Sequence, residues 1–318
     1  MIQVITADEK KRLSQVPADT ITADFDFTDK WIHLANPDDR EIEFISRALS
    51  VPENMLKAAL DEEERARADK DDGVTLIVAD MPKIEDEDDY YTYTTIPFGF
   101  IITEKAIITV SLDEETTIVN DFFYGRVKDF SIKKRTRFVL HFLYRISTKF
   151  LQYLTQIDKA SHRIQAELEK SMRNKELIEL LDLEKSLVYF SNSLRANRIL
   201  LDRLPKLAHF FEEDADLLDD VIIETNQAID TSNLYLEILS GTMDAYASII
   251  SNNLNIVMKV MTVITIMISI PSMVAAFWGM NTGVPFQGKL YGFWIAIGIS
   301  LVLCIITGII MFKKKFLK

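Results

Sequence analysis

The sequence predicts an α/β domain at the N-terminus, followed by a long-helix stalk and two C-terminal transmembrane helices. Three observations predict this class. Two long apolar runs lie at the C-terminus, charged residues are unevenly divided along the chain, and β-rich runs give way to long helical patterns. We place the cytoplasmic α/β domain at 1–130, the cytoplasmic long-helix region and stalk at 131–250, the first membrane helix at 251–278, the outer loop at 279–290, and the second membrane helix with its basic tail at 291–318.

The distribution of charged residues divides the chain into an acidic part and a part without acidic residues. Of the 36 basic and 48 acidic residues, residues 251–318 contain six basic ones and no acidic one, so residues 1–250 carry a net charge of -18. Such a body repels the phosphates of nucleic acids, which makes nucleic acid an unsuitable partner, and it attracts cations. Acidity that serves solubility alone is the alternative interpretation.

The single cysteine, Cys304, lies in an apolar run, which argues against a disulfide framework and a thiolate metal site. The first ten residues become charged within eight positions and lack the apolar core of a secretory signal. We therefore expect the body to be cytoplasmic.

Residues 1–130 alternate β-rich runs with helical patterns, which predicts the α/β domain. The β-rich runs are 31–34, 74–79, 91–103 and 106–112, and the helical patterns are 38–49 and 53–67.

Longer helices are predicted beyond this domain. Residues 134–172 and 174–204 contain no glycine or proline and space their apolar residues by three and four, so we expect two long helices, the second ending at Pro205. Residues 213–270 contain no proline and one glycine, Gly241, so a third helix is predicted to continue unbroken into the membrane. It could act as a lever that gates a pore or as a passive stalk.

The membrane assignment depends on residues 260–278 and 291–312, runs of 19 and 22 residues without Asp, Glu, Lys, Arg or His. At about 1.5 Å per residue, each is long enough to cross a hydrocarbon core of ~30 Å. The short loop between them makes a hairpin. The basic flank predicts that both chain termini are cytoplasmic in a plasma or inner membrane, and its residues are Lys313, Lys314, Lys315 and Lys318.

All hydroxyl-bearing side chains of the first membrane run share one helical face. Thr262, Thr265, Ser269 and Ser272, with Asn255 before them, occupy about 100° of the circumference. Because polar groups are costly in lipid, this face should meet other subunits or an aqueous pore. A weaker stripe in the second run is assigned to helix packing, and it consists of Ser300, Cys304 and Thr307.

Gly279, Met280 and Asn281 directly follow the first run. A Gly-Met-Asn tripeptide at this place resembles the signature of the CorA family of magnesium channels. Residues 255–260 at the inner end of the run and the lysine-rich C-terminus are also similar to that family. The resemblance covers the architecture of the whole chain, while its specific motifs lie within residues 250–318.

The resemblance implies a CorA-like funnel, a homopentamer in membrane lipid with a pore lined by the first run. It implies transport of Mg²⁺, with Co²⁺ and Ni²⁺ as further ions, driven by the electrochemical gradient and without an organic cofactor. Asn281 would hold the hydrated ion through its first-shell waters. Gly279 would allow a sharp departure of the backbone from the helix, and Met280 would pack.

At the cytoplasmic mouth, the resemblance implies a polar ring of Asn255. Met258, with Met261 or Thr262, would narrow the pore and close it by dewetting. Methionines at helical spacing also serve as ordinary packing residues.

The family further implies cytoplasmic divalent-ion sites between subunits that hold the pore shut. Asp220 lies thirty-five residues before Asn255 and matches a sensor aspartate by that spacing. Lys57 and Ala58 occupy the place of its expected acidic partner, which leaves residues 61–64 as substitutes. A solvated acidic face is the alternative interpretation of Asp220.

Two other functions remain open. The outer loop has Lys289 and no carboxylate, where magnesium channels of the family commonly have an acidic residue, so a zinc transporter of the same family, with or without proton coupling, is one alternative. A membrane-anchored acidic sensor or scaffold is the other.

An enzyme is not expected, because no nucleophile, base and orienting partner can be assembled from the sequence. Residues 283–290 nearly match a phosphate-binding loop, but Leu290 replaces the hydroxyl residue and no strand precedes the segment. The four histidines lack metal-ligand spacing, and they are His33, His141, His162 and His209.

Overall fold

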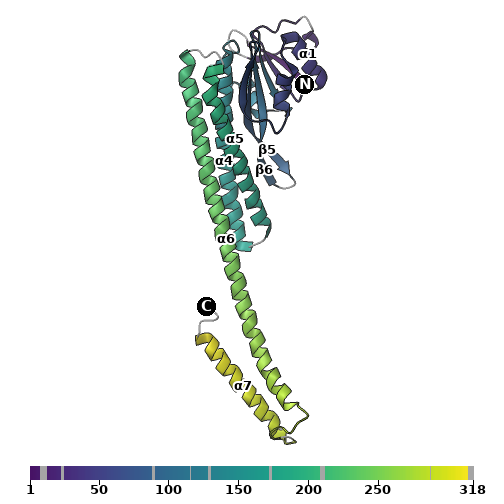
Figure 1. Ribbon diagram of the computed structural model, residues 1–318, viewed down its shortest axis with the longest axis vertical. Coiled ribbons are helices and arrows are strands. Elements are labelled where there is room, and N and C mark those ends of the chain that lie inside the picture. The colour runs from purple at the N-terminus through teal and green to yellow at the C-terminus, as the bar shows by residue number, and fades with distance from the viewer. Residues whose placement is uncertain are drawn as a thin grey trace. The chain divides into compact units, whose positions relative to one another are not determined.

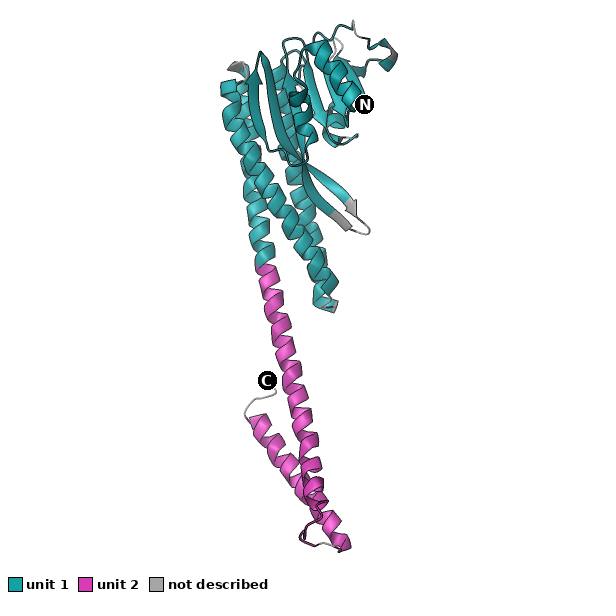
Figure 2. Cartoon of the chain, turned by 45° about the vertical axis from the view of Figure 1, so that its right-hand side comes forward, with its two compact units in different colours: residues 1–240 teal, residues 241–318 magenta. Residues whose placement is uncertain are grey.

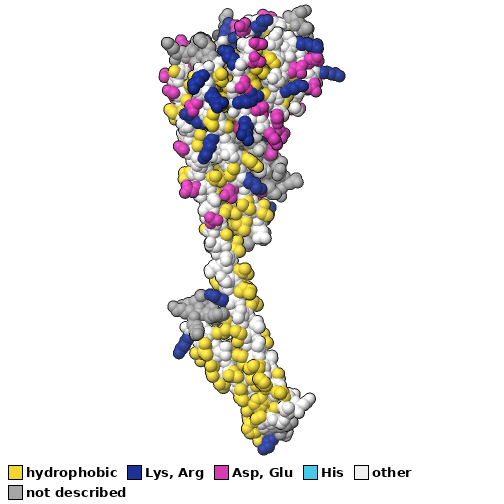
Figure 3. Space-filling model, in the orientation of Figure 1, with side chains coloured by type: hydrophobic (Ala, Val, Ile, Leu, Met, Phe, Trp, Pro, Cys, Tyr) yellow, Lys and Arg dark blue, Asp and Glu magenta, His cyan; other side chains and the backbone are white. Residues whose placement is uncertain are grey.

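The computed structural model describes residues 1–7, 13–22, 25–87, 90–114, 116–127, 130–171, 174–207, 212–286 and 288–313. The chain divides into two compact units, residues 1–240 and 241–318 (Figure 2). Charged side chains cover the first unit, whereas hydrophobic side chains dominate the visible face of the second (Figure 3). The lysines after residue 313 and His209 lie outside the described residues.

The described strands of the first unit form one sheet in the order β2-β1-β3-β7-β6-β5-β4. Strands β3 and β7 are parallel, and the other neighbouring strands are antiparallel. Their bounds are β1 (Ile2–Ala7), β2 (Leu13–Gln15), β3 (Trp31–Ala35), β4 (Arg67–Asp71), β5 (Val74–Glu87), β6 (Tyr90–Ile102) and β7 (Ile107–Ser111).

Helices cover both faces of this sheet (Figure 1). On one face, Ile42 and Ile45 of α1 (Asp39–Leu49) and Leu56 of α2 (Glu53–Lys57) pack with Ile32 and Val110. On the other face, aromatic rings join the strands to α3 (Thr117–Phe123) and α4 (Arg135–Ser171), and α5 (Asn174–Leu207) packs beside α4. The α/β fold predicted from the alternating pattern is confirmed.

Two predicted helix ends were wrong. The helix expected over 53–67 ends with a 3₁₀ turn at Ala58–Leu60, because Asp61 accepts the N–H of Glu63 through its side chain and starts a turn instead. The helix expected to end at Pro205 continues to Leu207, since proline removes only one hydrogen bond and Leu204 remains buried.

The long hairpin of β5 and β6 is fixed to α5 by polar contacts. The N–H of Asp80 donates to Asn197 Oδ1 at 2.9 Å, and Asn197 Nδ2 donates to Asp80 O at 2.8 Å. Thr95 Oγ1 and Ser193 Oγ lie 2.9 Å apart. These contacts position Asp80 at the edge of the sheet beneath α5.

The third long helix is continuous, as predicted. Helix α6 (Ala215–Trp278) begins in the first unit and ends in the second, and it contains Pro271. In the second unit it is followed by α7 (Leu290–Lys313). Both helices are long and apolar enough to span a membrane.

Candidate ion pathway

The hydroxyl-bearing face of α6 is exposed along its whole length. Thr262, Thr265, Ser269 and Ser272 each donate a hydrogen bond to the backbone carbonyl four residues earlier, at 2.7 to 3.0 Å. The donated proton is therefore occupied, and the oxygen lone pairs remain available on the helix surface. Such a surface can accept hydrogen bonds from water around a cation.

Helix α7 packs against a different side of α6. Val263, Met267, Ile270 and Val274 are shielded there, and their centre lies roughly 150° around the helix from the hydroxyls. In the described part of the chain, nothing covers the hydroxyl face. The polar stripe therefore has no partner within this unit.

The weaker polar stripe of α7 faces α6. Ser300, Cys304 and Thr307 are partly buried, and Cys304 Sγ lies 3.7 Å from Met267 O. In a regular helix, Met267 O would accept a hydrogen bond from the N–H of residue 271, but Pro271 has no N–H. The thiol of Cys304 lies at this unused acceptor. The structure agrees with the packing interpretation of this stripe.

At the inner end of the membrane run, the predicted constriction lies on the hydroxyl face. Asn255 is exposed, and Met258 and Met261 have exposed fractions of 58% and 53%. Two large apolar side chains thus extend from the same side of α6 as Thr262 and Thr265. Their role as a gate stays a prediction.

At the other end, α6 ends at Trp278 and Gly279 lies in the turn that follows it. Its N–H donates to Ala275 O at 2.9 Å, and the positive φ angles of the described loop occur at Phe286 (65°) and Gly288 (75°). An added Cβ at Gly279 would lie 3.3 Å from Ala275 O, so close packing also favours glycine. The chain thus leaves the helix at Gly279, and the described part of the loop turns again at Phe286 and Gly288.

Asn281 is exposed two residues after Gly279, and half of Met280 is exposed as well. The tripeptide follows α6 directly, so its side chains lie at the end of the helix that carries the hydroxyl face. The roles of Asn281 as an ion filter and of Met280 in packing stay predictions.

Asp220 lies on α6 with an exposed side chain. Of the candidate acidic partners at 61–64, Glu62, Glu63 and Glu64 line a cavity beside Asp80 in the same chain. A pairing between subunits would bring together residues of two chains, so the sensor role of Asp220 stays a prediction.

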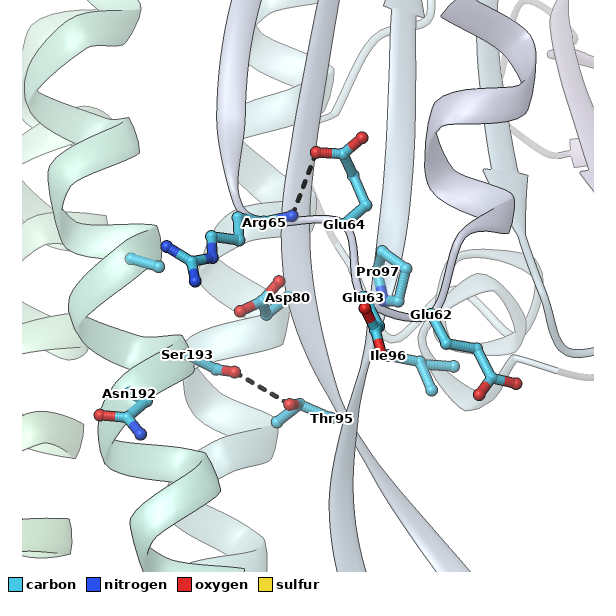
Figure 4. A pocket seen from close by; sticks show the side chains of 11 residues that line it. Glu62, Glu63, Glu64, Arg65, Asp80, Thr95, Ile96, Pro97, Asn192 and Ser193 are labelled. Carbon is cyan, nitrogen blue, oxygen red and sulfur yellow. Dashed lines mark hydrogen bonds between the residues drawn. The ribbon is translucent and has the colours of Figure 1, made fainter. Parts of the chain in front are cut away.

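That cavity was not predicted from the sequence. It has a volume of about 450 Å³ and lies between the sheet and α5. Figure 4 shows Asp80 and Arg65 reaching into it, with Asn192 and Ser193 on the side of α5. A lone aspartate in a strand gives no periodic signal, which is why sequence reasoning missed it.

Asp80 is half-buried, and among the described residues no ion pair involves it. Burial raises the pKa of its carboxyl group to about 6, against a smaller opposing effect of the hydrogen bond from Ser193. The other charged residues that line the cavity are Glu62, Glu63, Glu64 and Arg65.

We predict that Asp80→Asn stabilises the protein in a pH-dependent way. In the wild type the folded state keeps this proton between about pH 4 and 6 while the unfolded state releases it, so the free energy of unfolding falls as pH rises through that window. The variant should therefore be more stable by up to about 3 kcal/mol above pH 6, and equal near pH 4. Urea unfolding at pH 4 and 7.5 measures the difference.

Asp71→Asn is the control, because Asp71 is exposed on β4. A stability difference for Asp80→Asn that is the same at both pH values would contradict the assignment.

The described histidines lie apart from one another in the fold. His33 is a core residue whose Nδ1 lies 2.9 Å from Thr109 Oγ1, and burial lowers its pKa to about 4. His162 lies 3.6 Å from Asp158, one turn earlier on α4. Within the described ranges, no group of three or more His, Cys, Asp or Glu side chains could hold a metal ion. The segment 283–290, which nearly matches a phosphate-binding loop, follows α6 and ends at the first residue of α7. A helix therefore precedes it, and not the strand that a phosphate-binding loop requires.

Comparison with known proteins identifies matches over nearly the whole chain. The family model described as CorA-like Mg²⁺ transporter protein matches residues 29–314. The cobalt/magnesium transport protein CorA of Methanocaldococcus jannaschii is 27% identical, over 96% of each chain.

Solved structures give the same fold. The complete CorA magnesium transporter of Methanocaldococcus jannaschii superposes with a TM-score of 0.81, at 23% identity, over 99% of this chain and 98% of that chain. The ZntB cytoplasmic domain of Vibrio parahaemolyticus superposes with a TM-score of 0.58, at 11% identity, over 79% of this chain and 96% of that chain.

Proposed function

The chain belongs to the family of CorA-like Mg²⁺ transporter proteins, divalent-cation channels and transporters rather than enzymes, and we propose that it conducts Mg²⁺ through a pore lined by α6. The observation that carries this proposal is the uncovered hydroxyl face of α6, which leads directly to the exposed Asn281. A transported ion needs a continuous row of oxygen atoms across the bilayer. Thr262, Thr265, Ser269 and Ser272 supply oxygen atoms along α6, and Asn281 supplies one beyond the end of the helix.

One hairpin cannot enclose a pore, so the proposal requires several copies of the chain. Hydroxyl groups exposed to lipid cost free energy, and copies arranged around a common axis would turn all their hydroxyl faces toward water. We propose a homopentamer, as the family resemblance implies. The exposed face of each α6 would then become one fifth of the pore wall.

Neutral oxygen atoms suit hydrated Mg²⁺. This ion holds six oxygen ligands and dehydrates reluctantly, so amide groups that bind its waters can select it without removing them. A ring of Asn281 side chains provides such groups. Because residues 251–318 contain no acidic residue, no fixed carboxylate would trap the ion within the pore.

The membrane potential supplies the driving force. Two positive charges that enter a cell gain about 4.6 kcal/mol per 100 mV of inside-negative potential, so ATP is not required. Met258 and Met261 at the inner end would close the pore by excluding water when the helices approach one another. Co²⁺ and Ni²⁺ would follow the same path.

A zinc transporter of this family, with or without proton coupling, is the second candidate. The observation that favours it is the outer loop, which carries Lys289 and no carboxylate. The likeness to the ZntB domain supports the fold alone. A sensor or scaffold anchored by the hairpin would leave the exposed hydroxyl face without a use.

Uptake into liposomes tests these candidates. Purified protein would be reconstituted, and uptake of Mg²⁺, Co²⁺, Ni²⁺ and Zn²⁺ measured with and without a membrane potential or a proton gradient. Potential-driven Mg²⁺ uptake is expected. Zn²⁺ uptake that needs a proton gradient would favour the second candidate, and no uptake of any ion would favour the scaffold.

We predict that Thr265→Leu slows Mg²⁺ uptake more than Ser300→Leu does. The first change replaces an exposed hydroxyl on the proposed pore wall, and a lost hydrogen bond of roughly 0.5–1.5 kcal/mol corresponds to about a two- to tenfold slower rate. Ser300 is partly buried against α6, so its replacement should affect stability before conduction. The measurement is the rate of Mg²⁺ uptake by each variant at matched protein content. Equal slowing would indicate that the polar stripes of α6 and α7 both serve helix packing.

A further inference from the structure

The ends of α6 and α7 nearest the loop enclose an apolar groove within residues 241–318. Its volume is about 660 Å³, inside the range of roughly 300–1,000 Å³ typical of small-molecule sites. Val274, Ala275 and Trp278 line it from α6, and Phe293 and Ala296 line it from α7. The hydroxyl of Ser300, which also borders the groove, is already donated to Ala296 O at 3.0 Å.

The groove opens away from the hydroxyl face. Pro271, Val274, Ala275 and Trp278 are centred roughly 150° around α6 from the four hydroxyls. If the hydroxyls face a pore, which is the proposed function on which this step rests, the groove faces the bilayer. Its occupant should therefore be a hydrocarbon chain from the membrane.

A positive charge stands at the loop end of this groove. Lys289 immediately precedes α7, four residues before Phe293, which lines the groove, and its Nζ lies 5.6 Å from the centroid of the Tyr291 ring. Residues 251–318 contain no acidic side chain that could neutralise it. An anionic headgroup would complement this lysine.

Trp278 adds a hydrogen-bond donor to the groove. Its indole ring lines the groove, but its Nε1 is enclosed and has no hydrogen-bond partner among the described residues. An enclosed N–H without an acceptor costs free energy, and tryptophan at a membrane interface usually finds one. A small turn of the ring toward the groove would offer this N–H to a lipid ester carbonyl.

We propose that this groove binds an anionic phospholipid, with one acyl chain between α6 and α7 and its phosphate at Lys289. The ester region lies beside Trp278 in this arrangement. The lipid fills the groove that the two helices leave open and holds their loop ends together. A second copy of the chain would fill the same groove without any dependence on the headgroup.

Brominated lipids test the proposal through quenching of tryptophan fluorescence. In Trp294→Phe protein, Trp278 is the remaining tryptophan of the second unit, and Trp31 is fully buried in the first. The full chain would be placed in nanodiscs with brominated phosphatidylglycerol or phosphatidylcholine as a minor component. We expect Trp278 to prefer the anionic lipid about fivefold, the effect of one lysine near an anionic surface.

Three variants of this protein locate the site. Lys289→Gln should abolish the headgroup preference, and Ala296→Leu should reduce quenching by filling the groove. Gly298→Leu is the matched control, because it adds the same side chain to α7 where no atom lies within 4 Å. If Ala296→Leu fails to fold, Lys289→Gln decides alone.

Equal quenching by both lipids would overturn the proposal, as would an Ala296→Leu result that matches Gly298→Leu. Absence of quenching by either lipid would indicate a second copy in the groove. Mg²⁺ uptake by the same protein separates this outcome from the proposed function. Uptake without a lipid preference overturns the lipid site alone, whereas a lipid preference without uptake of any ion overturns the transport proposal.

Discussion

Asn281→Ala is expected to reduce Mg²⁺ uptake at least about tenfold while leaving the oligomer assembled. The side chain is exposed and contributes to no core, so its loss should not unfold the chain. Each amide that binds the hydrated ion makes a hydrogen bond to a charged species, worth roughly 1.5–3 kcal/mol, and about 1.4 kcal/mol corresponds to a factor of ten. Several copies of the chain would lose this contact together.

Uptake into liposomes under a fixed membrane potential measures this effect, and size-exclusion chromatography measures assembly. Asn253→Ala is the control, since it makes the same substitution two residues before Asn255, on the side of α6 away from the hydroxyls. Wild-type uptake by Asn281→Ala would rule out the filter. Loss of the oligomer would assign Asn281 to assembly instead.

Periodicity made most of the fold predictable. The apolar runs at 31–34 and 106–112 became the central strands β3 and β7, whose residues are buried on both faces. Helix α1 could be placed to within one residue because Asp38 and Glu41 form a capping box that fixes its start. The two membrane-length helices followed from length and apolar composition alone.

Strands at the edges of the sheet were not predicted. β2 has three residues and β4 reads Arg-Ala-Asp-Lys-Asp, so neither carries an alternating apolar pattern. Both strands pair with a strand next to them in the sequence, β2 with β1 and β4 with β5. Their own residues do not signal a strand, because the pairing and the packing of the neighbouring strand supply the stabilisation.

The candidate site was predictable for the same reason as the helices. Four hydroxyls at spacings of three and four must share a face of any helix, and the structure places them together and exposed. The helix ends at Trp278 and the turn begins at Gly279, as expected of a residue that permits both a helical and a turned backbone. Asp80 was missed because its environment consists of residues from β5, β6 and α5 that no spacing connects.

The second large effect is expected at the N-terminal end of α6. Carboxylates of neighbouring subunits repel one another until a divalent ion lies between them, so bound Mg²⁺ should favour a closed, symmetric arrangement. Asp220 is exposed on the helix that continues into the membrane run, which supports its proposed place at such a contact. An unbroken helix can transmit a change at that contact toward Met258.

Asp220→Lys is therefore expected to raise the Mg²⁺ concentration needed for closure at least about tenfold. Removal of one carboxylate beside a divalent ion at the protein surface should cost more than roughly 1.4 kcal/mol of binding free energy, which corresponds to a factor of ten. The new ammonium group occupies the place of the ion but cannot bridge two carboxylates. Protection of the cytoplasmic body from proteolysis, titrated with Mg²⁺, measures closure independently of conduction. Asp219→Lys is the matched control, since it makes the same charge change one residue earlier, about 100° around the exposed helix surface. If both variants keep the wild-type dependence on Mg²⁺, the acidic surface of α6 attracts ions or keeps the body soluble, and closure is controlled elsewhere.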